Sequence, residues 1–336
     1  MDERLPGAAP VKTTPAPPRF KDRSTGLVVF GALTLLMGSV AALCIPLFSI
    51  GKTSLRPIAF ARHDPSWTPA MVIIGIVAAA LIWLGIGSIK ARRWACALML
   101  IFSWSWLGVG GYVVASMAFI LPKTLPTFTT RGTVGHPAIR PELLNKVMFA
   151  IFLGLGVAFV ILPAVWTFFY RSPQVKATCD ARDRVRSWTD HCPLPVLGFC
   201  LWLIFSATAL LIMSMANHSV MPFFGKLLTG TPGLIVGLTI VAIWGYSAWS
   251  LYRLEQHGWW LMLVALTLFI VSNAMTFARH DVMELYQLMG HSPSQVTQAR
   301  GSGALIAIRM EWLTAGATVP LLAYLASIKQ FITKKP

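Results

Sequence analysis

Histidine and carboxylate side chains recur in the segments that join the apolar stretches of this chain. The pentapeptide Phe-Ala-Arg-His-Asp occurs twice, at residues 60–64 and 277–281. A Gly-His dipeptide occurs at residues 135–136 and again at 290–291, and each copy contributes one histidine. If these loops share one face of the protein, they form an outer-face polar cluster of His63, Asp64, His136, His280, Asp281, Glu284 and His291.

Two kinds of chemistry would suit this cluster. Imidazole and carboxylate groups bind metal ions, and an Asp–His pair can act as a general base. A histidine at a helix end is also an ordinary hydrogen-bonding residue, and the sequence leaves that alternative open at every position. No serine or cysteine lies in a recognisable nucleophile elbow, so a hydrolase is not supported. The sequence therefore does not favour an enzyme, and it leaves metal binding open.

Arg309 and Glu311 are charged residues that fall inside the last apolar segment. A charge near the centre of a bilayer costs at least about 2.5–3.5 kcal/mol, so an intramembrane ionisable residue indicates a functional site. Residues two apart on a helix point about 200° away from each other, so these two cannot pair directly. The alternative is that the last helix begins later, which leaves both residues near the headgroups.

The longest polar run away from the N-terminus, residues 170–193, lies near the middle of the chain. It contains Cys179, His191 and Cys192 beside three aspartates, but no Cys-x-x-Cys pair of the kind that marks zinc sites. The alternative is a solvated loop whose mixed charges pair with one another. No disulfide framework is predicted. The remaining cysteines lie in apolar runs and are expected to be small buried residues: Cys44, Cys96 and Cys200.

Composition places the rest of the chain in lipid. Of its 336 residues 56% are hydrophobic and 12% are charged, against about 25% charged in a soluble domain. A net charge of +16 could indicate nucleic acid, but the basic residues are scattered through loops, as beside membrane helices. Nucleic acid is therefore excluded as a partner. The expected partners are the lipid bilayer and other membrane subunits.

The hydropathy pattern predicts an all-α, polytopic membrane protein with eight transmembrane helices, because each apolar run can cross a core of about 30 Å. Two four-helix halves, 25–170 and 194–329, flank a linker at 171–193. Residues 1–24 are expected to form a disordered tail and residues 330–336 a short C-terminal tail. The predicted spans are 25–50, 70–90, 94–121, 147–170, 194–217, 233–253, 258–278 and 302–328.

Local patterns refine these spans. Residues 282–289 are amphipathic, which predicts a short helix lying on the outer face. Pro163 lies inside the fourth span, where it should kink the helix. Small residues four apart allow close helix packing in lipid, and such pairs are Gly38/Ala42, Gly75/Ala79, Gly111/Ala115 and Gly154/Ala158.

Lysine and arginine give the predicted orientation. With the N-terminus inside, the inner loops and tails hold seventeen of these residues and the longer outer loops hold ten. Positively charged loops stay in the cytoplasm, so both termini and the linker are predicted to be cytoplasmic. The expected location is the plasma (inner) membrane.

The two halves share an order of residues and loops that indicates an internal repeat. Four spans per copy is an even number, so both copies would have the same orientation, as parallel repeats about an axis along the membrane normal. Matching positions are Gly31, Ser39, Ala42 and Leu43 with Gly198, Ser206, Ala209 and Leu210; Ile82-Trp83 with Ile243-Trp244; and Trp94 with Trp259 or Trp260.

Absent motifs limit the function. No histidine lies deep in a span, which argues against b-type haem, and there is no Walker loop or dinucleotide fingerprint, so the sequence identifies no cofactor. The leading hypothesis is a carrier or a non-catalytic membrane subunit, with a path between the halves lined by Arg309 and Glu311. One alternative is a membrane-embedded enzyme or metal-binding subunit that uses outer-face His and Asp. The other is a scaffold subunit of a larger membrane complex.

Overall fold

The computed structural model describes residues 21–54, 67–130, 141–216, 218–291, 296 and 310–333. Long apolar helices make up most of this part of the chain. Seven of them are long and apolar enough to cross a membrane, and their apolar segments of 21–26 residues match a core of about 30 Å. They occur where the first seven spans are predicted. The prediction of an all-α, polytopic membrane architecture is confirmed to this extent.

Each half contains four long helical segments. The first half comprises α1 (Ser24–Ser54), α2 (Trp67–Ile89), α3 (Arg93–Thr130) and a continuous fourth segment of α4 (Pro141–Gly156), the π-helical turn η1 (Val157–Ile161) and α5 (Leu162–Tyr170). The second half comprises α7 (Leu194–Ala216), α8 (Gly230–Tyr252), α9 (Gln256–Phe277) and α13 (Met310–Thr333). The C-terminal part of the predicted eighth span, 302–328, coincides with α13, whereas residues 302–309 lie outside the described residues.

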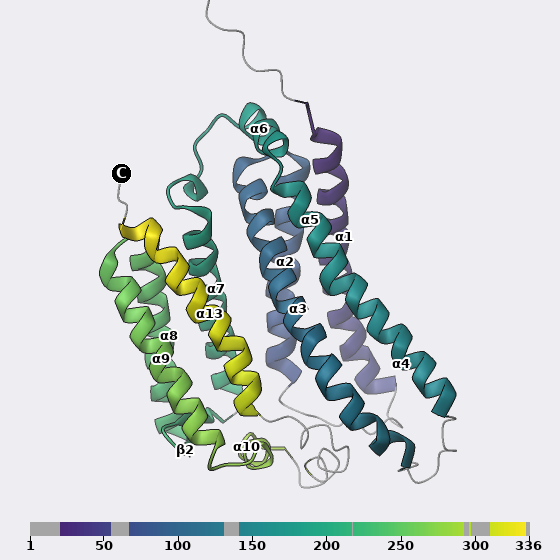
Figure 1. Cartoon of the computed structure of the whole chain (residues 1–336), viewed down its shortest axis with the longest axis vertical. Helices are drawn as coiled ribbons and strands as arrows, with labels where there is room; N and C mark the ends of the chain where they lie inside the picture. Colours follow the sequence, from purple (N-terminus) through teal and green to yellow (C-terminus); the bar gives the residue numbers. More distant parts are fainter. Residues whose placement is uncertain are drawn as a thin grey trace, which may run out of the picture.

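Short elements mark the two ends of the helices. At one end, called here the linker end, lie α6 (Pro173–Arg182) and the 3-10 turn η2 (Trp188–Asp190), with the start of α1 and the end of α13 (Figure 1). At the opposite end, called here the hairpin end, lie β1 (Met221–Phe223), β2 (Lys226–Leu228) and α10 (Val282–Leu288). The predicted amphipathic helix at 282–289 is confirmed as α10.

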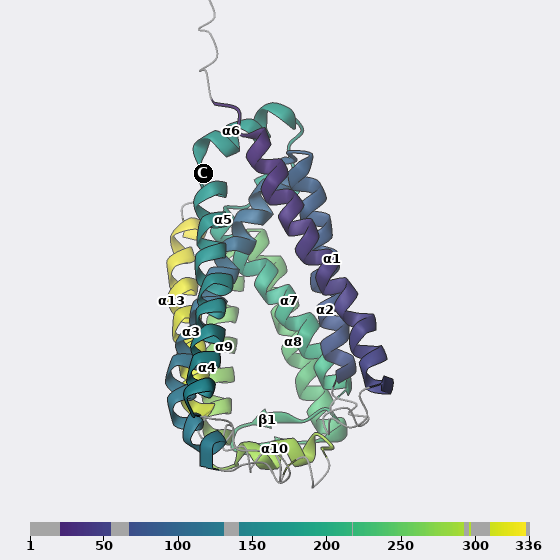
Figure 2. The same ribbon diagram turned by 90° about the vertical axis from the view of Figure 1, so that its right-hand side faces the viewer.

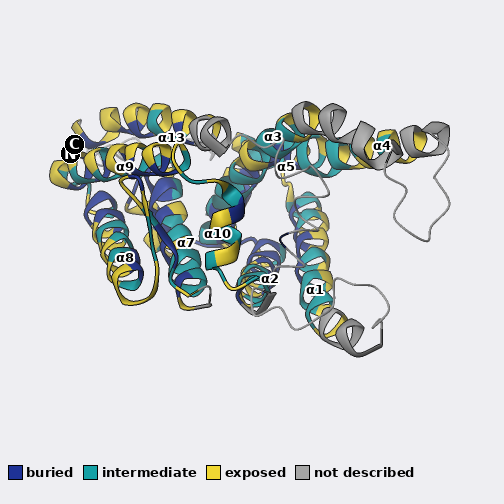
Figure 3. Ribbon diagram, turned by 90° about the horizontal axis from the view of Figure 1, so that it is seen from below, coloured by how far each residue is buried: buried dark blue, intermediate teal, exposed yellow. Residues whose placement is uncertain are grey.

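The long helices form two rows. Seen from the hairpin end, one row runs α8, α7, α2, α1 and the other runs α9, α13, α3, α4 (Figure 3). The ribbons of the two rows approach one another at the linker end and diverge toward the hairpin end, where β1 and α10 lie between them (Figure 2). In both rows the helices of the second half stand beside those of the first.

The turns that join α2 to α3 and α8 to α9 have the same geometry. Two positions after the last helical residue stands a residue with positive φ, Ala91 at 50° after α2 and Leu254 at 59° after α8. In each turn the next residue donates its N–H to the carbonyl five positions earlier, from Arg92 to Gly87 at 3.0 Å and from Glu255 to Ser250 at 3.1 Å. This six-to-one bond and the left-handed residue define a Schellman motif, which satisfies carbonyls at a helix end.

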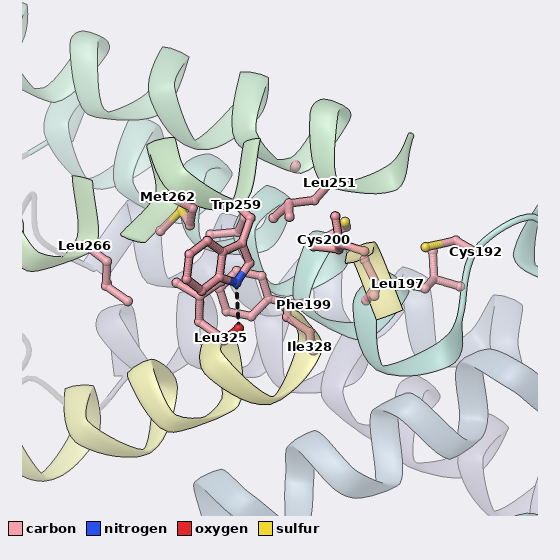
Figure 4. Packing of buried hydrophobic residues seen from close by; sticks show 14 residues of the cluster. Cys192, Leu197, Phe199, Cys200, Leu251, Trp259, Met262, Leu266, Leu325 and Ile328 are labelled. Carbon is pink, nitrogen blue, oxygen red and sulfur yellow. Dashed lines mark hydrogen bonds between the residues drawn. The ribbon is translucent and has the colours of Figure 1, made fainter. Parts of the chain in front are cut away.

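Each half has its own buried core near the linker end. In the first half, Leu27, Met99, Trp166 and Tyr170 pack together with further residues of α1, α2, α3, α5 and α6. In the second half, residues of α7, α8, α9 and α13 surround Trp259, with Cys192 of the linker at the edge (Figure 4). Ile101 of α3 and Leu201 of α7 pack against both cores. These two side chains therefore join the halves.

The linker is a folded element, and the alternative of a solvated loop is wrong for its first part. Arg93 of α3 contacts three aspartates of the linker. Its guanidinium lies 2.9 Å from Asp180 through Nε and 3.6 Å from Asp190 through an NH2 group. Its backbone N–H donates to the carboxylate of Asp183 at 3.3 Å. The expectation that Cys96 is a free buried residue is also wrong, since Cys96 and Cys179 form a disulfide. The two cysteines are 83 residues apart, so no local sequence pattern indicates that they pair.

Candidate functional site

A β-hairpin lies at the hairpin end, in the segment between the predicted spans 194–217 and 233–253. Met221 pairs with Leu228 across its two antiparallel strands. The two residues at the tip, Phe224 and Gly225, have φ values of 41° and 84°. Positive φ at both central residues is the mark of a type I′ turn, which matches the twist of a two-stranded ribbon. Glycine adopts this conformation readily, whereas Phe224 needs support from outside the hairpin.

The last turns of α9 provide that support. The N–H of Phe224 donates to Ser272 Oγ at 2.9 Å, and the N–H of Gly225 donates to Thr276 Oγ1 at 3.0 Å. Ser272 also donates to the carbonyl of Pro222 at 3.3 Å. The two hydroxyl residues are buried and stand one helical turn apart, so they present one polar face to the hairpin tip.

His280 extends this contact to α10. Its Nδ1 lies 2.8 Å from Glu284 Oε2, and its Nε2 lies 3.2 Å from the carbonyl oxygen of Gly225. A carboxylate and a carbonyl are both acceptors, so both contacts are hydrogen bonds only when both ring nitrogens carry protons. The hydrogen bond to Glu284 raises the pKa of His280 above its ordinary 6.5, and desolvation of the ring, with a smaller effect of the Arg279 charge, opposes the rise. When charged, His280 therefore links the hairpin tip, the end of α9 and α10.

We expect the hairpin tip to loosen as the pH rises. Because folding raises the pKa of His280, its stabilising contribution is complete below pH 6.5 and is lost as the pH rises through the folded-state pKa. Hydrogen–deuterium exchange at the amide of Gly225, corrected for the intrinsic effect of pH, measures the loosening. In the variant Glu284→Gln the change should move to lower pH. If the Gly225 amide of the wild type exchanged equally slowly below and above the pKa of His280, charged His280 would not hold the hairpin tip.

Thr276→Val should destabilise the same contact without a change of shape. The substitution leaves the buried N–H of Gly225 without its acceptor, which costs about 1–3 kcal/mol. Thr267→Val is the matched control, because Thr267 is exposed on α9 and its hydroxyl bonds only to the carbonyl of Leu263 in its own helix. Thermal unfolding in detergent should separate the two variants. Equal unfolding temperatures would show that α9 does not hold the hairpin.

The structure brings together some residues of the predicted outer-face cluster. His280 and Glu284 are in contact, Asp281 is the residue immediately before α10, and the ring of His291 stacks on Tyr286 with 4.9 Å between centroids. Within the described part of the chain, no three His, Cys, Asp or Glu residues are placed to hold one metal ion. The rest of the cluster lies outside the described residues: His63, Asp64 and His136.

The charged pair of the last span is placed only in part. Glu311 lies in the first turn of α13 at the hairpin end, whereas its side chain and the whole of Arg309 lie outside the described part. The functional role of the two charges stays a prediction. In the linker, Cys179 is bonded to Cys96, and Cys192 is buried in the core of the second half. These two cysteines therefore do not form the zinc site considered from the sequence.

A second polar group lies at the linker end and has no counterpart in the sequence analysis. His257 Nε2 lies 3.0 Å from Ser250 Oγ, 3.2 Å from Tyr246 Oη and 3.2 Å from Glu255 Oε2. The Schellman turn brings Glu255 and His257 back onto the last turn of α8, and the sequence gives no local signal for it because Leu254, and not glycine, stands at the left-handed position. In a Ser–His–acid triad the serine and the carboxylate contact opposite ring nitrogens, whereas here they share one. Ser250 is also fully buried, so this group is not built as a nucleophile.

The polar side chains of the described residues therefore join neighbouring elements. They fix the hairpin tip to α9 at the hairpin end, and they fix the α8–α9 turn and the linker at the linker end. Their hydrogen bonds join backbone and side chains of neighbouring elements, which is a structural role. Searches with protein-family models, curated proteins and solved structures find no match to this chain.

Proposed function

We propose that this chain is a non-catalytic carrier of the plasma (inner) membrane that holds an apolar or amphipathic molecule between two four-helix halves. The observation that carries the proposal is a groove of about 200 Å³ where α2 of the first half meets α7 of the second. Its lining is apolar apart from one hydroxyl, that of Thr208, which bonds to the carbonyl of Ile204 in its own helix. The residues that line it are Ile73, Ile76, Leu201, Ile204, Phe205, Thr208, Ala209 and Ile212.

The proposal includes an eighth span and a duplicated origin. α13 is 24 residues long and packs against α9, where Trp259 donates to the carbonyl of Leu325 at 2.8 Å. The matching Schellman turns support a duplication of one four-helix unit. The order of helices along each row, with one half beside the other, favours copies displaced sideways over copies related by a half-turn (Figure 3).

The apolar groove determines the class of passenger. A carrier for an ion or a sugar needs groups that replace the water around its substrate, because unpaired polar groups are expensive in an apolar site. The groove between α2 and α7 offers none apart from Thr208. Arg309 and Glu311 would then serve the polar end of an amphipathic passenger.

Filling the groove tests the proposal. The wild-type chain, purified in a mild detergent and measured by native mass spectrometry, should retain an apolar ligand. Ala209→Trp places an indole in the groove and should reduce the bound fraction at least tenfold. Ala32→Trp, at an exposed position of α1, is the matched control and should leave binding unchanged. No bound ligand in the wild type, or equal occupancy in both variants, would contradict the carrier.

A role as a subunit of a larger membrane complex is the second candidate. Within an apolar 18-residue stretch of the Lys146–Tyr170 span, 6% of the residues are buried, against 17–33% in the corresponding stretches of the other six candidate spans. A Cβ added at Gly154 or Gly111 would meet no described atom within 4 Å, so these two predicted small-residue contacts are not made inside the described chain. Purification in native lipid discs with mass spectrometry tests this candidate. A partner contacting this segment would support it, and a chain isolated alone would count against it.

A further inference from the structure

The disulfide at the linker end joins two elements that are distant in sequence. Cys96 lies in the first turn of α3 and Cys179 in α6, 83 residues later. Cys179 is 1% exposed, whereas Cys96 is half-buried. An incoming thiol can therefore approach the sulfur of Cys96 more readily than that of Cys179.

The same interface is also held by bonds that do not depend on sulfur. Arg93 contacts Asp180 at 2.9 Å, and the N–H of Arg23 donates to Thr178 Oγ1 at 3.2 Å. Val175 of α6 is buried against the core of the first half. α6 can therefore keep its place when the disulfide is reduced, and the two redox states differ in how firmly the linker is fixed.

The compartment matters for this pair. Lysine and arginine are concentrated at the linker end, and this distribution supports its cytoplasmic placement in the proposed orientation. Disulfides are rare in the reducing cytoplasm, and those that form there are usually transient and redox-sensing. The inference below rests on that proposed orientation.

We infer that Cys96 and Cys179 form a reversible redox site that exchanges with cytoplasmic thiols of the glutathione or thioredoxin class. A thiolate forms a bond to Cys96 Sγ while the Cys96–Cys179 bond breaks, and Cys179 leaves as a thiolate that takes a proton. A second thiol then displaces Cys96 and leaves as a disulfide with the first. Two electrons and two protons pass to the pair, and the reverse exchange with a disulfide restores the bond.

The site controls how tightly the halves are tied at the linker end. The linker is fixed to the second half because Cys192 is buried in its core and Tyr252 Oη donates to the carbonyl of Trp188 at 3.1 Å. Burial raises the pKa of the Cys192 thiol to about 11, so it stays protonated and does not compete in the exchange. The disulfide adds the covalent link to the first half, and reduction removes it.

Differential alkylation of the full chain in native membranes tests the inference. Membranes are equilibrated in glutathione buffers from fully reduced to fully oxidised, acid-quenched and analysed by mass spectrometry. The Cys96–Cys179 pair should titrate between dithiol and disulfide, and hydrogen exchange in residues 173–182 should rise at least several-fold in the reduced state. Cys96→Ser should exchange like the reduced wild type, and Cys44→Ser, in α1, should match the untreated wild type.

Two outcomes would overturn the inference: a pair that keeps one redox state in every buffer, or equal exchange of α6 in the dithiol and disulfide states. An impermeant maleimide added to intact cells carrying Lys176→Cys reports separately which side the linker faces. A wrong orientation is thereby distinguished from a pair that does not exchange. Ligand binding by the Ala209→Trp and Ala32→Trp variants is a separate measurement. Its outcome tests the carrier and does not depend on whether the cysteine pair exchanges or on which side the linker faces.

Discussion

Replacing Trp259 by alanine is expected to lower the free energy of unfolding by about 3–5 kcal/mol. Trp259 fills the centre of the second-half core, between α9 and α13, and is 6% exposed (Figure 4). The alanine variant leaves a cavity and removes the donor to the carbonyl of Leu325. It also removes the ring beneath the ammonium of Lys329, which lies 4.6 Å from the ring centre. Unfolding in detergent, followed by tryptophan fluorescence and circular dichroism, measures the loss.

The neighbouring Trp260 is the control for that experiment. It is 55% exposed, its ring meets Trp259 edge-on, and lipid or detergent can replace most of its contacts. Trp260→Ala should therefore cost less than about 1 kcal/mol. If the two variants lost equal stability, Trp259 would not anchor α13 to α9, and the proposed eighth span would lose its main support.

Gly110→Ala is the second substitution with a large expected effect, about 1–3 kcal/mol or more. Pro163 cannot donate a helical hydrogen bond to the carbonyl four residues earlier, that of Phe159, and the chain forms a π-helical turn there. This carbonyl lies directly against Gly110 of α3, where an added Cβ would overlap its oxygen. The backbone must move to accept even one methyl group, so α3 and the fourth span would separate.

Gly108 lies two residues earlier on the same helix and provides the matched control. A Cβ at Gly108 meets no described atom within 4 Å, so Gly108→Ala should be neutral or stabilise the helix by about 0.5–1 kcal/mol. Both variants can be compared by thermal unfolding in the same detergent. A lower unfolding temperature for Gly110→Ala, with an unchanged or higher one for Gly108→Ala, supports the close approach of α3 to Phe159. Two variants that both unfold at the wild-type temperature would contradict it.

Much of the helical framework could be predicted from the sequence, because it depends on one strong local property. An apolar run of about 20 residues needs a helix to satisfy its backbone in lipid, and this signal depends on no distant partner. The α7 helix, Leu194–Ala216, coincides with the predicted span 194–217. The amphipathic pattern of α10 is equally local, and it was predicted correctly.

The contacts that hold the helix ends depend on distant partners, and the sequence did not show them. Nothing near Cys96 indicates Cys179, and Ser272 and Thr276 resemble ordinary span residues until the hairpin reaches them. The hairpin has no clear turn signal in the sequence, because Phe224 is an unusual residue for a position with positive φ. In the predicted outer-face cluster, the spacing of His280 and Glu284 could suggest their pairing, but no local pattern indicates that His280 also reaches Gly225.

Labelling of single cysteines in intact cells tests most directly whether the helices cross a membrane with the linker end inside. The native cysteines are replaced by serine, and one cysteine is introduced as Lys226→Cys in the hairpin or as Lys176→Cys in α6; both lysines are exposed. We predict that an impermeant maleimide labels the Lys226→Cys chain in intact cells and the Lys176→Cys chain only after permeabilisation. Labelling of both chains in intact cells, or the reverse pattern, would contradict the account.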